Sequence, residues 1–204
     1  MNRAVAALLL PCILVAGGCA ALTDGAGTLR IVAPDPHLAA ADGGPPADYT
    51  LTIQRPIADK TRGTSRVIVR SGHARLAFYP DVAWVDELPE MLQSLLLQAF
   101  TDKGQWTGIV RPGAARARYS LGTEIRRFEA VEQGDGRLVV ELQVQAGLLE
   151  VRSGRLVASQ VFESRVPVAG NDVDALIAAF ESALGELIGD LIAWTRATAP
   201  DEDT

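Results

Sequence analysis

Three consecutive stretches decide the fold of this chain: RYSLGTEIRRFEAV (118–131), RLVVELQVQAGLLEV (137–151) and RLVASQVFESRV (155–166). Each is rich in β-branched and apolar residues and has the length of a strand. Short glycine-bearing turns of the kind found in β-hairpins connect them, at 133–136 and 153–154. The stretches therefore predict an antiparallel meander. The alternation in the middle stretch changes phase after Gly147, which predicts a β-bulge there.

Shorter strand-like stretches precede the meander. Residues 49–53 alternate between polar and apolar side chains. Residues 66–70 and 74–79 are also strand-like, and the Ser71-Gly72 pair between them predicts a hairpin.

Two stretches have the 3.6-residue period of amphipathic helices. The first begins near Asp86 and ends near Lys103-Gly104. The second follows Gly170, with Asn171 as a plausible N-cap, and runs past Trp194. Because each helix has a single apolar stripe, we expect both to pack on one face of the sheet. The expected fold is α/β, a single domain with a mixed, mainly antiparallel sheet.

Acidic residues on these helices have two interpretations. Asp86, Glu87 and Glu90 crowd the start of the first helix, where a catalytic carboxylate pair is one possibility. Acids at a helix N-terminus are also favoured by the helix dipole and by capping, and we prefer that explanation. The second helix could lie on a membrane or a partner, but its polar face carries acids where interfacial helices prefer Lys and Arg, which favours a core role.

The N-terminus has the architecture of a secretion signal. One positive charge, Arg3, precedes an apolar run that ends on small residues directly before Cys19. The run is shorter than the about 20 residues that a transmembrane helix needs. The stretch 14–19 resembles the lipobox of bacterial lipoproteins, which implies that Cys19 receives a diacylglycerol. The alternative is an ordinary signal peptide followed by a buried cysteine.

Composition divides the chain into four segments. Residues 1–18 are the expected signal peptide, and 19–48 a lipidated N-terminus and flexible tether rich in Gly and Pro, with one apolar island at 29–32 that could dock as an edge strand. Residues 49–197 are the expected domain, and 198–204 an acidic disordered tail. The only other cysteine, Cys12, leaves with the signal peptide, so no disulfide is expected in the mature chain.

The charge balance argues against nonspecific nucleic-acid binding. The chain has a formal net charge of −6, which becomes −7 once Arg3 is removed. Seventeen of the 19 cationic residues are Arg, since only Lys60 and Lys103 are Lys. Coding bias explains this enrichment, and recognition of an anionic ligand is the alternative.

No catalytic or metal-binding motif is present in the sequence. His37 lies in the Gly/Pro-rich segment and His73 beside a predicted turn, and neither has the spacing of a metal ligand. Neither a GxSxG nucleophile motif nor a nucleotide-binding glycine motif occurs. We therefore expect no metal, no cofactor and no enzymatic activity.

The order of several weak motifs resembles the ABC-type transport auxiliary lipoproteins over residues 28–195. Two of these motifs are a strand that ends in an aromatic residue and a tryptophan before the first helix. The matching residues are Val69, Arg70, Leu76, Tyr79, Trp84, Leu88, Tyr119 to Leu121, Phe128, Phe162 to Pro167 and Trp194. The chain departs from the family at WVDELP (84–89), where the proline is displaced and the start of the helix is uncertain.

The resemblance implies a non-catalytic lipoprotein on the periplasmic side of the outer membrane. It implies partners in an inner-membrane ABC permease and ATPase and an MCE-domain protein that move lipids or organic solvents. Ala20 follows the cysteine, and the aspartate that commonly retains such lipoproteins in the inner membrane is absent there. The alternatives are a structural envelope lipoprotein that self-associates into a homo-oligomer, and a periplasmic lipid-binding carrier.

Overall fold

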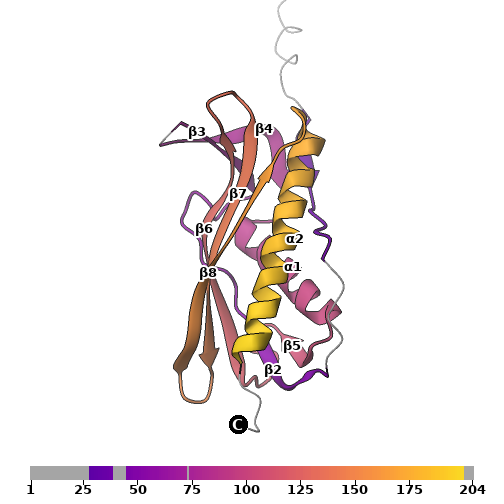
Figure 1. Ribbon diagram of the computed structural model, residues 1–204, viewed down its shortest axis with the longest axis vertical. Coiled ribbons are helices and arrows are strands. Elements are labelled where there is room, and N and C mark those ends of the chain that lie inside the picture. The colour runs from indigo at the N-terminus through magenta and orange to yellow at the C-terminus, as the bar shows by residue number, and fades with distance from the viewer. Residues whose placement is uncertain (1–27, 39–44, 73, 200–204) are drawn as a thin grey trace, which may run out of the picture.

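Eight strands and two helices form within residues 28–38, 45–72 and 74–199, which are the residues that the computed structural model describes (Figure 1). The strands are β1 (Arg30–Val32), β2 (Ala47–Ile53), β3 (Arg66–Ser71), β4 (Arg75–Trp84), β5 (Trp106–Val110), β6 (Tyr119–Glu132), β7 (Leu138–Glu150) and β8 (Arg155–Pro167). The helices are α1 (Leu88–Asp102) and α2 (Val173–Thr198).

Strand β6 organises the sheet. Along one edge it pairs antiparallel with β7 over its whole length. Along the other edge it pairs in parallel with two strands in series, first with β2 at Tyr119–Leu121 and then with β3 at Glu129–Glu132. The register of the β6–β7 ladder shifts between Ile125 and Arg127, where neither parallel ladder is present. A bulge therefore lies where one neighbour gives way to the other.

The remaining strands extend this arrangement outward. Strand β8 continues the antiparallel meander beyond β7, as the sequence predicts. On the other side β5 pairs in parallel with β2, β4 pairs antiparallel with β3, and the short β1 pairs in parallel with β4. Figure 1 shows both helices on the same side of the sheet, with α2 along the meander. The expected α/β domain with a mixed sheet is confirmed.

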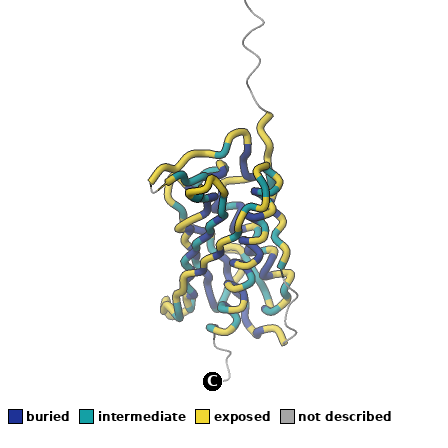
Figure 2. Tube along the Cα trace, turned by 45° about the horizontal axis from the view of Figure 1, so that its top comes forward, coloured by how far each residue is buried: buried dark blue, intermediate teal, exposed yellow. Residues whose placement is uncertain are grey.

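Aromatic side chains fill the space between α2 and the sheet. The ring of Phe180 on α2 stacks on Phe128 of β6 with centroids 5.3 Å apart, and Trp84 of β4 meets Phe180 edge-on at 5.0 Å. All three are buried, and Figure 2 shows buried positions throughout the interior. The apolar stripe of α2 is therefore core, as expected. Among the described residues, no helix has both the length and the apolarity to cross a membrane.

Three local features differ from the sequence prediction. The N-cap of α2 is Asp172, not Asn171, because its carboxylate accepts a hydrogen bond from the amide of Ala175 at 2.8 Å. The ladder between β7 and β8 has a bulge next to Gly147, but its extra residue is Val157 of β8, opposite Leu148 and Leu149, and not a residue of β7. Side chains of β7 keep alternating between the two faces beyond Gly147.

The elements around α1 also differ in detail. Strand β4 continues through Pro80 and Asp81 to Trp84, five residues beyond the predicted end, with Asp81 in the left-handed region at φ 53°. Pro89 lies in the first turn of α1, where its missing N–H costs no helical hydrogen bond, so the displaced proline is compatible with the helix. Strand β5 was not predicted.

A buried carboxylate ties the outer face of the sheet together. Phe128 and Ala130 of β6 point into the core, so Glu129 between them points to the opposite face, where it is fully buried. Arg62 donates to one oxygen at 2.8 Å and Arg70 donates to the other at 2.6 Å. The pairs join the loop before β3, and β3 itself, to β6.

Replacing this carboxylate tests its contribution to stability. Glu129→Ala leaves the buried guanidinium of Arg62 without its partner in β6, so we expect a loss of about 3–5 kcal/mol in the free energy of unfolding, measured by urea denaturation. Glu132→Ala, at an exposed position of the same strand, is the control and should change this free energy by less than about 0.5 kcal/mol. Equal effects of the two variants would contradict the assignment.

Candidate functional site

The described N-terminal segment, residues 28–38, forms a strap along α2. It begins beside the start of the helix, where Arg30 pairs with Asp174 at 2.8 Å, and contributes β1 to the sheet. Further along, the amide of Asp35 donates a hydrogen bond to the carboxylate of Glu181 at 3.0 Å. Figure 1 shows the strap, in indigo, running beside α2. Two polar contacts and a strand therefore fix it to the domain.

A glycine in α2 lets the strap approach the helix closely. A Cβ atom at Gly185 would lie 2.6 Å from the carbonyl oxygen of His37, closer than any stable contact. Leu38, the next residue, packs against the hydrophobic core. The apolar island in this segment docks as the edge strand β1, and the residues after it are also docked. The described part of the expected flexible tether (19–48) is thus folded against the domain, which corrects that expectation for residues 28–38.

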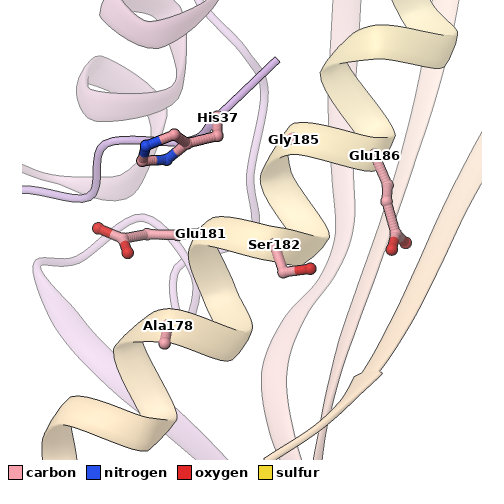
Figure 3. A pocket seen from close by; sticks show the side chains of 6 residues that line it. All are labelled: His37, Ala178, Glu181, Ser182, Gly185 and Glu186. Carbon is pink, nitrogen blue, oxygen red and sulfur yellow. The ribbon is translucent and has the colours of Figure 1, made fainter. Parts of the chain in front are cut away.

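A cavity of about 440 Å³ lies beside this crossing (Figure 3). Its lining comprises His37 of the strap and five residues of α2, Ala178, Glu181, Ser182, Gly185 and Glu186. Both carboxylates already have partners, since Glu181 accepts from the Asp35 amide and Glu186 accepts from the hydroxyl of Ser164 on β8 at 2.6 Å. The cavity therefore marks a junction of strap, helix and sheet.

The cavity contains the residue types of a catalytic triad but not its geometry. In Figure 3 the hydroxyl of Ser182 points away from the imidazole of His37. Within the described residues, no hydrogen bond joins that imidazole to Ser182 or to a glutamate of the cavity. A triad needs its base within hydrogen-bond reach of both the nucleophile and the acid. The arrangement supports a binding or structural role better than acyl transfer.

The other candidate residues from the sequence are dispersed. Cys19 and His73 lie outside the described residues. In the part of the chain that the structure describes, no three His, Cys, Asp or Glu side chains are grouped as a metal site. Sequence reasoning placed His37 in the tether and did not bring it next to α2, although Gly185 inside a helical pattern is a signal of close approach.

The acids at the start of α1 belong to an ion-pair cluster. Arg55, just after β2, donates a hydrogen bond to Glu90 and lies 3.7 Å from Glu87. The hydrogen bond from Arg55 lowers the pKa of Glu90 below its ordinary value, although partial burial acts in the opposite direction. Asp86 accepts from the amide of Glu87 at 2.8 Å. These contacts are structural, but they are ion pairs and not the expected capping, because Glu87 is the N-cap of α1 and its side chain makes no capping hydrogen bond.

Two glycines of α2 allow a matched test of the strap. Gly185→Ala should displace His37 and cost about 1–3 kcal/mol of stability, because the added methyl group meets backbone. Gly189→Ala in the same helix meets nothing within 4 Å and should stabilise the protein by about 0.5–1 kcal/mol. Hydrogen exchange of the Asp35 amide should accelerate only in the Gly185 variant. Unchanged exchange there would contradict the close packing.

Comparison with solved structures gives relatives of the same fold. The crystal structure of protein XCC0632 from Xanthomonas campestris, assigned to the family DUF330, superposes with a TM-score of 0.78 at 29% sequence identity. The match covers 83% of this chain and 95% of that chain. A second structure, of an uncharacterized protein, matches with a TM-score of 0.61 at 11% identity over 78% of this chain and 99% of that chain, which shows the fold alone.

Sequence comparison identifies the family. An uncharacterized protein of Bradyrhizobium diazoefficiens, bll6063, is 28% identical over 147 residues, which are 72% of this chain and 39% of that protein. The chain thus spans about two fifths of the length of this curated relative. The family described as "ABC-type transport auxiliary lipoprotein component" matches residues 30–191. The chain therefore belongs to the ABC-type transport auxiliary lipoprotein family.

Proposed function

We propose that this protein is a non-catalytic component of an ABC/MCE-type envelope transport system that moves lipids or organic solvents between membranes. The observation that carries the proposal is the family match over residues 30–191, behind a lipobox-like segment that ends in Cys19. The proposed partners are an inner-membrane ABC permease with its ATPase and an MCE-domain protein. The cavity beside α2 supports a non-catalytic role, because its His, Ser and Glu residues lack the geometry of a triad.

Lipidation of Cys19 would hold the domain close to a membrane. Nine residue steps separate Cys19 from Thr28 (28 − 19 = 9), where the described structure begins. At about 3.3 Å per residue, these steps span at most about 30 Å. Because the strap is fixed to α2, the domain would follow its anchor within that distance. Ala20, in place of an aspartate, supports attachment to the outer membrane on its periplasmic side.

Of the two alternatives, self-association has some structural support. Strand β8 pairs only with β7 within the described residues, so one edge of a 13-residue strand is open to another chain. Light scattering that shows a concentration-independent monomer would exclude it. A carrier with a cavity between helix and sheet is less compatible, because Phe128, Phe180 and Trp84 occupy that space.

The anchor is tested at the cysteine itself. A Cys19→Ser precursor should lose labelling by radioactive palmitate and appear in the soluble periplasmic fraction, because the hydroxyl of serine does not take the diacylglycerol. Fractionation and labelling of cells that produce each form measure both effects. Undiminished labelling and membrane partition of the variant would overturn the anchor.

Association with a transporter is tested by co-purification. Detergent extracts of the native host, passed over the tagged lipoprotein, should yield a permease, an ATPase or an MCE-domain protein identified by mass spectrometry. The Gly185→Ala variant is a useful comparison, since it alters the strap and leaves the other surfaces of the domain in place. Repeated recovery of the wild-type protein without any transport component would count against the proposal.

A further inference from the structure

The turn between β7 and β8 forms an exposed tip, defined here as residues 149–156. All of its residues except Glu150 are exposed. Gly154, with φ at +70°, closes the turn. Figure 1 shows the tip at the lower end of the sheet, opposite the end where the strap begins. The tip contributes no residue to the lining of the cavity beside α2.

Aliphatic side chains gather on the tip, where solvated turns normally carry polar residues. Leu149 and Leu156 are direct partners across the ladder, with exposed fractions of 37% and 57%. Val151, in the turn itself, is 49% exposed. A Cβ atom at Gly147 would lie 3.4 Å from the side chain of Leu156, which shows that Leu156 lies over its neighbouring strand. Leu149 and Leu156 therefore form a small aliphatic patch, and Val151 adds a third exposed aliphatic side chain to the tip.

Arginines lie close to this patch, since Arg152 and Arg155 are exposed within the tip and the carbonyl of Arg118 accepts a hydrogen bond from the amide of Val151 at 2.9 Å. The pKa of Glu150 is lowered, first by a hydrogen bond from the hydroxyl of Ser153, and also by the positive charges of Arg155, Arg118 and Arg152, while burial acts in the opposite direction. The tip itself holds Arg152, Arg155 and Glu150 and so has a net charge of +1, although the chain as a whole carries −6. The tip is therefore both apolar and cationic.

We propose that the tip binds the surface of a lipid bilayer that contains anionic lipids. Guanidinium groups match phosphate oxygens in geometry and charge, and aliphatic side chains beside them can enter the boundary between headgroups and acyl chains. A single turn offers far less than the about 800 Å² per partner that stable protein interfaces bury, so a bilayer fits this small projecting patch better than an acidic protein does. The proposal depends on the tip alone and not on the lipidation of Cys19.

The test uses residues 28–204, which lack both the signal segment and Cys19. A chain of this extent is expected to fold alone, because the crystallised Xanthomonas relative has 95% of its chain covered by the match. In vesicle sedimentation the protein should bind vesicles of phosphatidylglycerol mixed with phosphatidylethanolamine, and salt should weaken the binding. It should bind vesicles of phosphatidylcholine alone much more weakly.

Two variants with equal loss of charge locate the binding. Replacing Arg152 and Arg155 by Ala should weaken binding by about 25-fold, since each basic residue near an anionic surface contributes about fivefold. Replacing Arg75 and Arg137 by Ala removes the same charge from exposed positions elsewhere and should weaken it much less. Leu156→Ser should also weaken binding while leaving the circular dichroism spectrum unchanged.

Three results would overturn the proposal. Absence of binding to anionic vesicles would exclude the bilayer as the partner. Equal losses in the two arginine variants would show a general effect of charge without a role for the tip. Concentration-dependent dimerisation in light scattering, abolished by Leu156→Ser, would assign the tip to contacts between two copies of the chain.

Discussion

One edge of β6 is shared by two parallel neighbours, and the rest of the fold depends on how this edge is divided. Strands β2 and β3 each need backbone partners, and β6 is long enough to give its first residues to β2 and its last to β3. The bulge near Arg126 lies between the two ladders. Beyond it, Glu129 faces away from the core and accepts hydrogen bonds from Arg62 and Arg70. Side chains as well as the backbone therefore hold the second half of this edge to its neighbours. On the core face of β6, Phe128 stacks on the ring of Phe180, and this contact positions α2 on the meander.

The elements that the sequence predicts well are those with a strong local pattern. The three-stranded meander has long strands and glycine-bearing turns, and α2 has an apolar stripe over several turns, so both follow from periodicity. Strand β5 has only five residues, with Gly108 in the middle, and its place beside β2 is a non-local pairing. The parallel ladders of β6 join residues 61 and 68 positions apart, and no local pattern encodes them. At the start of α2, Asn171 and Asp172 are both good caps, and only the backbone conformation decides between them.

The strap, residues 28–38, shows why composition alone wrongly assigned this segment to a flexible tether. Proline and glycine are frequent both in linkers and in segments that lie extended against a domain. Their frequency alone therefore does not distinguish the two situations. What distinguishes the strap is its contacts with α2, at Asp174, Glu181 and Gly185, and these residues lie about 145 positions away in the sequence. Gly185 is the one local signal, since a glycine within a helical pattern carries a stability cost that close packing can offset. The same contacts bring His37 to a helix that carries Ser182 and Glu181, a combination that sequence spacing could not reveal.

The two ends of the sheet differ in chemistry, and the difference follows from strand direction. Strands β4 and β7 run away from the end at which the strap begins, while β6 and β8 run toward it. The β7–β8 turn consequently lies at the far end from Thr28, and its arginines and exposed leucines cannot share a surface with the start of the strap. An anchor attached through the strap and a second contact at the tip would therefore hold the domain at both ends of its sheet. Such a domain would lie along a membrane or reach between two surfaces, whereas an anchor alone would fix only one end of the sheet.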